Sequence, residues 1–446
     1  MSKTNHRSLV IKFGLIAGWI IMALSILVPA NQIHAATILV TNANDSGAGS
    51  LRQAITNAIS GDTIKFSPSL SGQTILLASQ LDITKNLVID GSGLIPRVSI
   101  SGNNAVRIFN VNSNRIFTLK SLILKDGKTT GTSYTTFGGA LFVNNNTTLS
   151  VDNTLFTNNT AYSAGAIYLS PSVTASITNS EITGNEANTE GGAIRINGIG
   201  AINLKNNIIS DNVSGGAGAI YFYSGTQNSI IENNVFENNY AIAGGAIAGE
   251  MPVSTLEIRN NLFIGNQATG SYQAGGAVYF TAHTIPSLII LENNTFYNNA
   301  ATWNGGGAYL GMGPTYYLIN NTFSNNMATT GGNLYLDHGT SLPRMYNNII
   351  ANHTGGGDCT AFSNTYINGS NNLIEDGSVN CLPNLTGDPG LLPLLHNGGA
   401  TQTMALSSNS TAIDAGNNSF CTTIDQRGTR RPQGTACDLG AVELDE

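Results

Sequence analysis

Charged residues are scarce in this chain of 446 residues: Lys, Arg, Asp and Glu together account for 10% of it. The 26 acidic residues outnumber the 19 basic ones and no basic stripe occurs, which argues against a nucleic-acid partner. Helical periodicity is missing from the middle of the chain. Short runs of Ile, Val, Phe, Tyr and Thr lie instead between Gly and Asn, a pattern typical of β-strands joined by turns. Such runs bury enough apolar surface to exclude a disordered chain.

Cysteine is scarce as well, and all four cysteines lie late in the chain: Cys359, Cys381, Cys421 and Cys437. Four cysteines allow three pairings in an oxidising compartment, and proximity in the sequence favours Cys359–Cys381 and Cys421–Cys437. A metal site is the alternative. Because no short Cys-x-x-Cys pair exists, we expect disulfides, with no metal and no cofactor.

The N-terminal segment contains no acidic residue and is typical of an export signal. Three basic residues, Lys3, Arg7 and Lys12, precede an apolar run over 13–28. Small residues near Ala35 follow it, as at a signal-peptide cleavage site. The alternative is an uncleaved membrane anchor, although the run is short for a spanning helix. Removing the segment leaves 16 basic and 26 acidic residues, a charge of 16 − 26 = −10. We expect a secreted or cell-surface protein that meets a membrane only through this segment, before cleavage.

The strongest positive feature is a repeat of about 27 residues that extends from about Gly138 to Thr354. The copies are variants of one pattern, which is Gly-Gly-Ala-Ile, a short strand and then Asn-Asn-x-Phe-x-x-Asn. A period of this size means that each copy is one coil of a stacked array and needs its neighbours to bury its apolar side. The later apolar anchors of successive copies are Phe156, Ile182, Ile209, Phe236, Phe263, Phe296, Phe323 and Ile350.

Alignment of the copies predicts which side chains face the core. The residue two positions before each Asn-Asn pair is apolar in every copy, so it should point inward and the next residue outward. That outward column contains Lys205, Glu232, Arg259 and Glu292. We interpret it as a ladder of alternating charge that holds the coils in register, in preference to a catalytic group.

Asparagine marks two turns of every coil. We expect the first column to adopt the left-handed backbone conformation and to hydrogen-bond from coil to coil. This first column consists of Asn153, Asn179, Asn206, Asn233, Asn260, Asn293, Asn320 and Asn347. The second turn column consists of Asn159, Asn185, Asn212, Asn239, Asn266, Asn299 and Asn326.

The strand after each Gly-Ala step carries the candidate ligand-binding surface. Its neighbours are apolar, as Ile167 and Leu169 are, so the residue two after Ala should point outward. An exposed aromatic stripe with an arginine suits stacking against sugars; alternatively, the rings merely cover the sheet and stack on each other. The column reads Phe142, Tyr168, Arg195, Tyr221, Ala248, Tyr279, Leu310 and Tyr335. We take Phe142, Tyr168, Arg195, Tyr221, Tyr279 and Tyr335 as candidate ligand-binding residues.

Both ends of a stacked coil expose strand edges and need caps. The segment 50–59 predicts a short amphipathic helix that covers the first coil, with Ser50 and Gln53 as a capping box. Its apolar face would consist of Leu51, Ala54, Ile55, Ala58 and Ile59. Near the C-terminus, charge concentrates in Asp425, Arg427, Arg430, Arg431, Asp438 and Glu443. We interpret this cluster as an Arg–carboxylate network in a disulfide-containing cap; an active site is the alternative.

The sequence gives catalysis little support. The repeats lack the clustered acids that a Ca²⁺-dependent lyase or a glycosidase would need on one face. The weak candidates are Asp337 and His338, with Arg344, His353 and Asp358 near in sequence. Adjacent residues on a strand point to opposite faces, which disfavours a joint role unless both lie in a turn. No nucleophile elbow, phosphate loop or His-rich metal motif occurs.

The pairing of Gly-Gly-Ala-Ile with Phe-x-x-Asn resembles the polymorphic outer membrane protein repeat, which implies a right-handed, pectin-lyase-like parallel β-helix. The segment 46–55 is similar to the start of many bacterial surface β-helix proteins. The C-terminal segment resembles the choice-of-anchor Q domain family in Asp388-Pro389, Asn397-Gly398-Gly399, 412–416, 425–428, Arg431-Pro432 and 438–443. Members of that family usually carry a sorting tail. None follows here, so we leave open release into the medium and attachment through a partner.

We therefore expect an all-β, right-handed parallel β-helix with a short N-terminal capping helix and a small disulfide-containing C-terminal cap. The expected parts are a signal peptide (1–35), the N-terminal cap and first coils (36–137), the repeat coils (138–380) and the C-terminal cap (381–446). The expected function is non-catalytic adhesion or binding of extracellular polysaccharide or cell-surface partners. A polysaccharide lyase or glycoside hydrolase is the first alternative, and a passive scaffold is the second.

Overall fold

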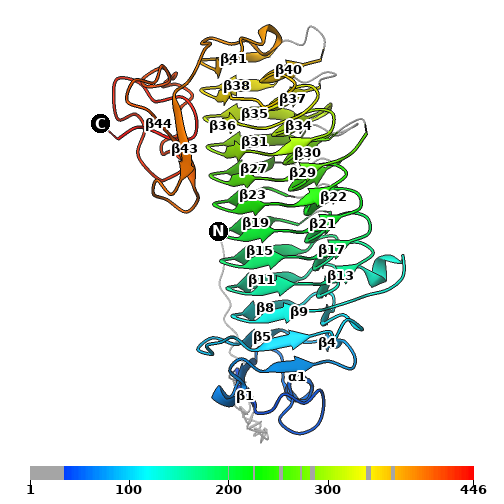
Figure 1. Cartoon of the computed structure of the whole chain (residues 1–446). Helices are drawn as coiled ribbons and strands as arrows, with labels where there is room; N and C mark the ends of the chain where they lie inside the picture. Colours follow the sequence, from blue (N-terminus) through cyan, green and yellow to red (C-terminus); the bar gives the residue numbers. More distant parts are fainter. Residues whose placement is uncertain are drawn as a thin grey trace, which may run out of the picture. The chain divides into compact units, whose positions relative to one another are not determined.

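The computed structural model describes residues 35–445 except 199, 225–226, 251–254, 272–273, 282–286, 338–342 and 363–366. The segment from Ala35 onward forms one compact unit, a stack of coils with a smaller C-terminal part beside it (Figure 1). The expected signal peptide lies outside the described residues apart from Ala35. Within the described ranges, no helix has the length and apolar character needed to cross a membrane.

Four parallel sheets run along the stack, and each coil contributes at most one strand to each of them. Sheet A contains β1 (Thr37–Val40), β2 (Thr63–Phe66), β5 (Leu87–Asp90), β8 (Ile116–Lys120), β11 (Thr148–Asp152), β15 (Thr174–Thr178), β19 (Ile202–Lys205), β23 (Ser229–Glu232), β27 (Thr255–Arg259), β31 (Leu288–Glu292), β35 (Thr315–Ile319), β38 (Arg344–Tyr346) and β41 (Asn368–Ser370). Sheet B contains β3 (Thr74–Leu76), β6 (Ser99–Ser101), β9 (Ile123–Lys125), β12 (Leu155–Thr157), β16 (Glu181–Thr183), β20 (Ile208–Ser210), β24 (Val235–Glu237), β28 (Leu262–Ile264), β32 (Thr295–Tyr297), β36 (Thr322–Ser324), β39 (Ile349–Ala351) and β42 (Leu373–Ile374).

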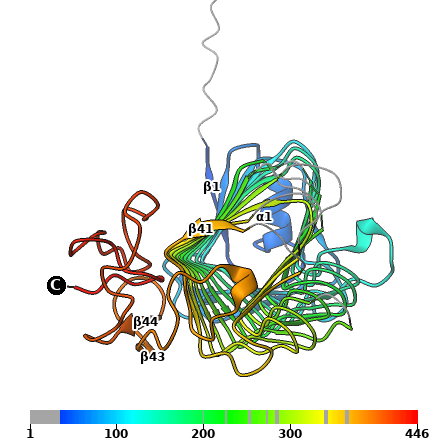
Figure 2. The same cartoon turned by 90° about the horizontal axis from the view of Figure 1, so that it is seen from above.

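The other two sheets complete the circuit of each coil. Sheet C contains β4 (Leu81–Ile83), β7 (Phe109–Val111), β10 (Leu141–Val143), β14 (Ile167–Leu169), β18 (Ile194–Asn197), β22 (Ile220–Ser224), β26 (Ile247–Gly249), β30 (Val278–Phe280), β34 (Ala308–Leu310), β37 (Leu334–Leu336) and β40 (Cys359–Ala361). Sheet D contains β13 (Thr160–Ala161), β17 (Glu186–Ala187), β21 (Val213–Ser214), β25 (Tyr240–Ala241), β29 (Gln267–Ala268) and β33 (Ala300–Ala301). Seen from above in Figure 2, the coils lie over one another, so equivalent side chains form columns.

The core is built from the inward columns that the repeat predicts. Val151, Phe156 and Ile177 are fully buried members of one continuous cluster. Where the anchor column carries phenylalanine in consecutive coils, the rings of Phe263 and Phe296 stack with centroids 4.6 Å apart and planes 4° apart. Identical side chains on adjacent coils therefore pack face to face, as the repeat requires.

The predicted left-handed asparagine turns are confirmed. All members of the first column have a positive φ, from 48° at Asn153 to 58° at Asn347. The hydrogen-bonded ladder at this turn uses the following residue, however: the Asn207 amide nitrogen donates to Asn234 Oδ1 at 2.9 Å. The second column forms a ladder as predicted, with Asn212 donating to Asn239 Oδ1 at 3.0 Å.

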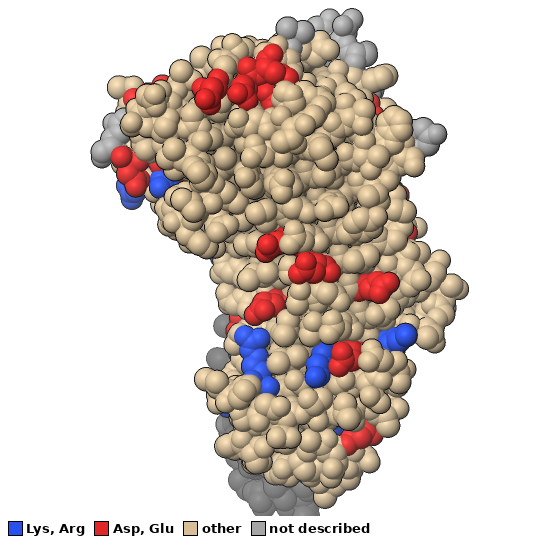
Figure 3. Space-filling model, viewed as in Figure 1, with Lys and Arg blue, Asp and Glu red and all other residues tan. Residues whose placement is uncertain are grey.

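Three members of the predicted charge ladder pair on the outer face of sheet A, whereas the fourth, Glu292, makes no ion pair with a described residue. Lys205 and Arg259 pair with the Glu232 carboxylate from either side, at 2.9 and 3.5 Å. These side chains are partly exposed, so each pair contributes at most about 1 kcal/mol to stability. Figure 3 shows how few charged groups lie on this side of the molecule.

The predicted N-terminal capping helix is α1 (Leu51–Asn57), and Leu51, Ala54 and Ile55 are buried against the first coils. The Ser50 hydroxyl accepts from the Gln53 backbone N–H, but the Gln53 side chain donates to Asn57, so only half of the capping box forms. The prediction that Ile59 lies on the buried face is wrong: it is 45% exposed. The helix ends before this position, so helical spacing no longer sets its direction.

The C-terminal segment divides into two parts. The short helix η3 (Val379–Cys381) lies over the last coil (Figure 2), and fully buried Cys381 bonds to Cys359 in the core. The rest, with the antiparallel strands β43 (Leu391–Leu395) and β44 (Thr403–Leu406), turns back along the side of the stack (Figure 1). Only the first part therefore covers the end, and the expected cap over 381–446 is mainly a flank.

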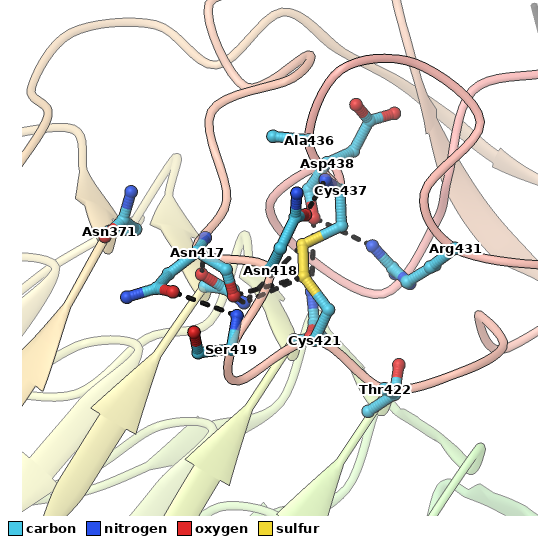
Figure 4. Close-up of a disulfide and its surroundings, with 12 residues drawn as sticks. Asn371, Asn417, Asn418, Ser419, Cys421, Thr422, Arg431, Ala436, Cys437 and Asp438 are labelled. Atoms are coloured by element: carbon cyan, nitrogen blue, oxygen red, sulfur yellow. Dashed lines mark hydrogen bonds between the residues drawn. A yellow bond between two sulfur atoms is a disulfide. The ribbon is translucent and has the colours of Figure 1, made fainter.

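The returning segment docks on the outward turn between sheets A and B. Three asparagines of the first column donate to its backbone: Asn293 to Ile424 O, Asn320 to Asp438 O and Asn347 to Asn417 O. The second predicted disulfide, Cys421–Cys437, is also confirmed (Figure 4). The Asn347 amide donates to Cys421 Sγ at 3.3 Å.

The predicted Arg–carboxylate network holds the returning segment together. Arg431 pairs with Glu443 at 3.0 Å with both side chains buried, and Arg427 pairs with Asp425 at 2.8 Å. Burial raises the pKa of the Glu443 carboxyl above its ordinary value, although the Arg431 charge opposes that shift. The arrangement leaves both carboxylates occupied, which favours the structural interpretation of this cluster.

Candidate functional site

The aromatic column lies on the outer face of sheet C, as predicted, but one member differs. Strand pairing places Tyr309 between Tyr279 and Tyr335, and the expected member Leu310 faces the core, fully buried. The cause is a third glycine in the run 305–307, which displaces the count from the Gly-Ala step by one residue.

The expected exposure of this column is wrong. Tyr168, Tyr221 and Tyr279 are 2%, 2% and 5% exposed. Adjacent rings stack, Tyr279 on Tyr309 and Tyr309 on Tyr335, with centroids 5.2 and 5.3 Å apart. Burial raises the pKa of Tyr279 to about 12. The column therefore covers the sheet by stacking on itself, which was the alternative interpretation.

Glycine turns before two of the sheet C strands complete this burial. Gly244, which precedes β26, has a φ of 61°, and a Cβ on it would approach the Tyr279 Cβ to 2.9 Å. A Cβ on Gly331 would likewise come within 3.2 Å of the Tyr335 Cβ. Arg195 lies in the column against the rings of Phe137 and Tyr223, and it pairs with Glu190 at 2.9 Å, so its charge is already satisfied.

The weak catalytic candidates are only partly placed. Asp337 accepts a hydrogen bond from the Tyr309 hydroxyl at 2.6 Å, at the end of the aromatic column. His338 lies outside the described residues. Arg344 stacks over the ring of Tyr317, 5.0 Å from its centroid, on sheet A. These contacts are structural. Asp337 binds a residue of sheet C, whereas Arg344 contacts a residue of sheet A.

Among the described residues, His353, Asp358 and Asp376 have ligand atoms within 4.8 Å of one another, close enough in principle to hold a metal ion. The carboxylate oxygens of this group already accept hydrogen bonds: Asp358 from the Asn333 amide, from His353 and from the Asp376 N–H, and Asp376 from the Asp358 N–H and Ser378. Burial raises the pKa of Asp358 above its ordinary value. The group terminates the second asparagine ladder, which reaches it through Asn333.

A better candidate site lies at the N-terminal end of the aromatic column, and sequence reasoning missed it. Two adjoining pockets of about 560 and 320 Å³ share Gln80, Arg107 and Thr135. We call them together the basic groove. Its other lining residues are Ser79, Ala105, Val106, Asn110, Asn112, Ser113, Arg115, Lys128, Thr129, Thr130, Thr136, Phe142 and Asn144. None of the described residues in this lining carries a carboxylate or an imidazole.

Arg107 lines both pockets of the groove, and its hydrogen-bond donors already bind other groups of the protein. Its guanidinium donates to three backbone carbonyls, those of Gly138, Thr135 and Phe137, and to the side chain of Gln80. It lies 4.9 Å from the centroid of the Phe142 ring. Burial lowers the pKa of Arg107 to about 10, which still leaves it charged at neutral pH.

Arg115 is different, because its donors are unused. This residue directly precedes β8, and within the described part of the chain its side chain makes no hydrogen bond or ion pair. Its Nε is buried without a partner. Lys128, which follows β9, is exposed in the smaller pocket and also has no ion pair among the described residues. Two cationic groups are therefore free to meet a ligand.

The amides of the groove are held in place by one another. Asn144 donates to Asn110 Oδ1 at 3.1 Å, and Asn110 donates to Asp82 at 2.8 Å. The exposed edge of this network and the Arg115 guanidinium offer donors and acceptors in one place. Such a set can hold a hydroxyl-rich, negatively charged molecule.

The signal that could have revealed the groove is the pair Arg107 and Arg115 in a chain with few charges. Both lie in early coils without the strong repeat motif, where columns could not be aligned. Their convergence depends on the loop over 129–137, whose carbonyls bind Arg107, and nothing in the repeat encodes that loop.

The sheets define the class of fold: a right-handed parallel β-helix, as expected. Residues 111–285 match a family model described as "Right handed beta helix region". A search of curated proteins gave no match.

Among solved structures, the chain is similar to the crystal structure of pectate lyase Pel9A, with 14% identity, a TM-score of 0.38 and coverage of 92% of this chain and 96% of that one. It is also similar to the PL6 family alginate lyase AlyGC, with 13% identity and a TM-score of 0.47. There the match covers 92% of this chain but only 60% of the lyase. At these identities and TM-scores the similarity is one of fold and carries no information about activity.

Proposed function

We propose that this protein is secreted or displayed at the cell surface and binds acidic extracellular polysaccharide without cleaving it. One observation carries the proposal: in a chain with a formal charge of −7, the basic groove gathers Arg107, Arg115 and Lys128 and has no carboxylate among the described residues that line it. A site of this charge attracts anionic ligands by complementarity.

The arrangement suits a sugar chain for three further reasons. The groove continues from the larger pocket past Arg107 into the smaller one, so several sugar units can lie along it. Its amide and hydroxyl groups can donate hydrogen bonds to sugar hydroxyls and accept hydrogen bonds from them. Arg115 supplies an unpaired planar guanidinium, which recognises a carboxylate or sulfate through two parallel hydrogen bonds.

The same lining supports binding over hydrolysis. Hydrolysis of a glycosidic bond uses a pair of carboxylates that flank the scissile bond, and the described lining offers none. Elimination can use a basic side chain instead, so the assay of unsaturated chain ends below decides between binding and a lyase activity. Export rests on the N-terminal signal pattern and on the two disulfides, which are typical of oxidising compartments.

The test uses the chain from Ala36 onward with polygalacturonate, alginate and uncharged dextran. Binding is followed by calorimetry at low and high salt, and released reducing and unsaturated chain ends are assayed in parallel. We expect binding of an acidic polymer that weakens as salt rises, and a loss of about tenfold or more in Arg115→Ala. Lys205→Ala, a matched loss of one cation on sheet A, should bind as the unchanged protein does.

Two results would overturn the proposal. Equal affinity in Arg115→Ala and the unchanged protein would remove the groove as the site. Release of unsaturated or reducing ends above a heat-inactivated control would replace the binding function with a lyase or glycosidase activity.

A further inference from the structure

A second cleft lies where the returning C-terminal segment passes over the outer face of sheet B. It has a volume of about 490 Å³ and is bounded on one side by strands β20, β24 and β28 and on the other by the loop between β43 and β44. We call it the hairpin cleft. Pockets that form between two packed parts of a chain, with volumes of about 300–1,000 Å³, are the usual sites of small ligands.

The floor of the hairpin cleft is aliphatic. Ile208, Val235 and Ile264 project from successive strands of sheet B, and Ile208 remains 45% exposed. Further along the same sheet the returning segment covers the equivalent column, so that Ile349 and Leu373 are fully buried. The cleft therefore occupies the stretch of this apolar column that the returning segment leaves open.

The opposite wall of the cleft is held rigidly. The Thr401 hydroxyl donates to the Asn260 carbonyl on the β-helix and accepts from the Gln426 amide at 2.9 Å. Asn397 donates across the same loop to the Thr403 carbonyl at 2.8 Å. These bonds fix His396, Ala400 and Gln402 opposite the floor without using their side chains.

Several polar side chains that line the cleft have no hydrogen-bonding partner among the described residues. Within the described part of the chain, the side chains of Asn233, Glu237, His396 and Gln402 make no hydrogen bond or ion pair, although all four line the cleft. Together they provide amide, carboxylate and imidazole groups that can donate to and accept from hydroxyls. No lysine or arginine is among the described lining residues, so no fixed cation is present to receive an acid group.

We propose that the hairpin cleft is a second saccharide-binding site, independent of the basic groove, and that it binds an uncharged sugar unit. The aliphatic floor covers the C–H face of a pyranose ring, while Asn233 and Glu237 bond its hydroxyls from one side and His396 and Gln402 from the other. The Glu237 carboxylate repels acidic sugars, because like charges brought together in a partly buried site disfavour binding. The charge of each site therefore selects a different class of glycan.

The experiment titrates the chain from Ala36 onward with maltotriose, cellotriose, mannotriose and trigalacturonate, using saturation-transfer NMR and calorimetry. The variants are Glu237→Gln, which removes the acceptor charge, and Ala400→Trp, which fills the cleft from its wall. Glu181→Gln is the matched control, because it neutralises an exposed carboxylate on the same face of sheet B outside the cleft. Circular dichroism confirms that each variant is folded.

We expect at least one neutral trisaccharide to bind, with affinity at least tenfold lower in Glu237→Gln, lost in Ala400→Trp and unchanged in Glu181→Gln. Trigalacturonate binding should be unaffected by these changes and reduced in Arg115→Ala. The inference is overturned if no neutral trisaccharide binds, or if both cleft variants bind it as the unchanged protein does. If the unchanged protein binds a neutral trisaccharide but not trigalacturonate, the proposed function is contradicted and the inference about the hairpin cleft stands.

Discussion

The first asparagine ladder allows a sharp prediction about stability. Asn234 is fully buried, and its amide donates to Leu204 O and to Asn261 Oδ1, both at 3.0 Å. Its own Oδ1 accepts from the backbone N–H and the side chain of Asn207, both at 2.9 Å. Asn234→Ala would therefore remove four hydrogen bonds between three adjacent coils.

The expected loss of stability depends on which hydrogen bonds each former partner of Asn234 retains. The Asn207 amide still donates to Ile177 O, and Asn261 Oδ1 still accepts from the residue 234 backbone N–H. The Asn207 N–H loses its acceptor in a region that water does not reach, which costs about 1–3 kcal/mol. With about 1 kcal/mol for the weakened partners, we expect Asn234→Ala to lower the free energy of unfolding by about 2–4 kcal/mol.

The assay combines urea denaturation with amide hydrogen exchange, because a stacked array can open locally before it unfolds as a whole. Exchange should accelerate in the coils that contain Leu204, Asn234 and Asn261 and remain slow near the N-terminal helix. Asn233→Gly is the control: it lies one residue away in a turn with φ of 57°, makes no side-chain bond to the described residues, and should change stability by less than about 1 kcal/mol. Equal effects of the two substitutions would refute this account of the ladder.

Two further predictions concern the core and the last coil. Phe263→Ala removes a ring stacked at 4.8 and 4.6 Å from its two neighbours, and should destabilise the protein by about 3–5 kcal/mol in urea titrations; a loss below about 1 kcal/mol would contradict the packing. Burial raises the pKa of Asp376, but hydrogen bonds from Ser378 and the Asp358 N–H outweigh it and hold the pKa below the ordinary 3.8. The unfolded chain therefore binds the proton more tightly, so stability present above about pH 4 is lost as pH falls through the folded pKa. Melting temperatures measured from pH 6 to pH 2 should fall less steeply in Asp376→Asn than in the unchanged protein, and identical slopes would exclude this role.

The proposed functions depend on two surfaces that differ in charge and origin. The basic groove is made within the early coils, around Arg107 and Arg115, and the hairpin cleft exists only because the C-terminal segment returns along the stack. If both sites bind as proposed, one molecule holds an acidic polymer and a neutral sugar at once. That combination suits a protein that links components of an extracellular matrix.

The aromatic column shows where reasoning from the sequence reached its limit. Alternation along a strand correctly placed Tyr168 and Tyr221 on the outer face of sheet C. Their exposure depends on what lies over that face, and the glycine turns and stacked neighbours cover it. The choice of Leu310 over Tyr309 failed for a local reason, because one extra glycine cannot be assigned to a turn or a strand by counting.

The features that recur with the repeat could be derived from the amino-acid sequence alone. Contacts between adjacent coils recur with the period of the chain, so the columns of Phe263, Asn234 and Glu232 and the left-handed turns could be aligned without a structure. The disulfide pairing also followed from short separations of 22 and 16 residues.

Where the chain departs from its repeat, its course depends on contacts between residues far apart in the sequence. The bond from Asn293 to Ile424 joins residues 131 positions apart, and no periodicity relates them. The course of the returning segment, the hairpin cleft and the convergence of Arg107 with the loop over 129–137 all depend on such contacts. Their partners are single residues whose meeting depends on the geometry of the whole chain, so no pattern along the sequence could identify them.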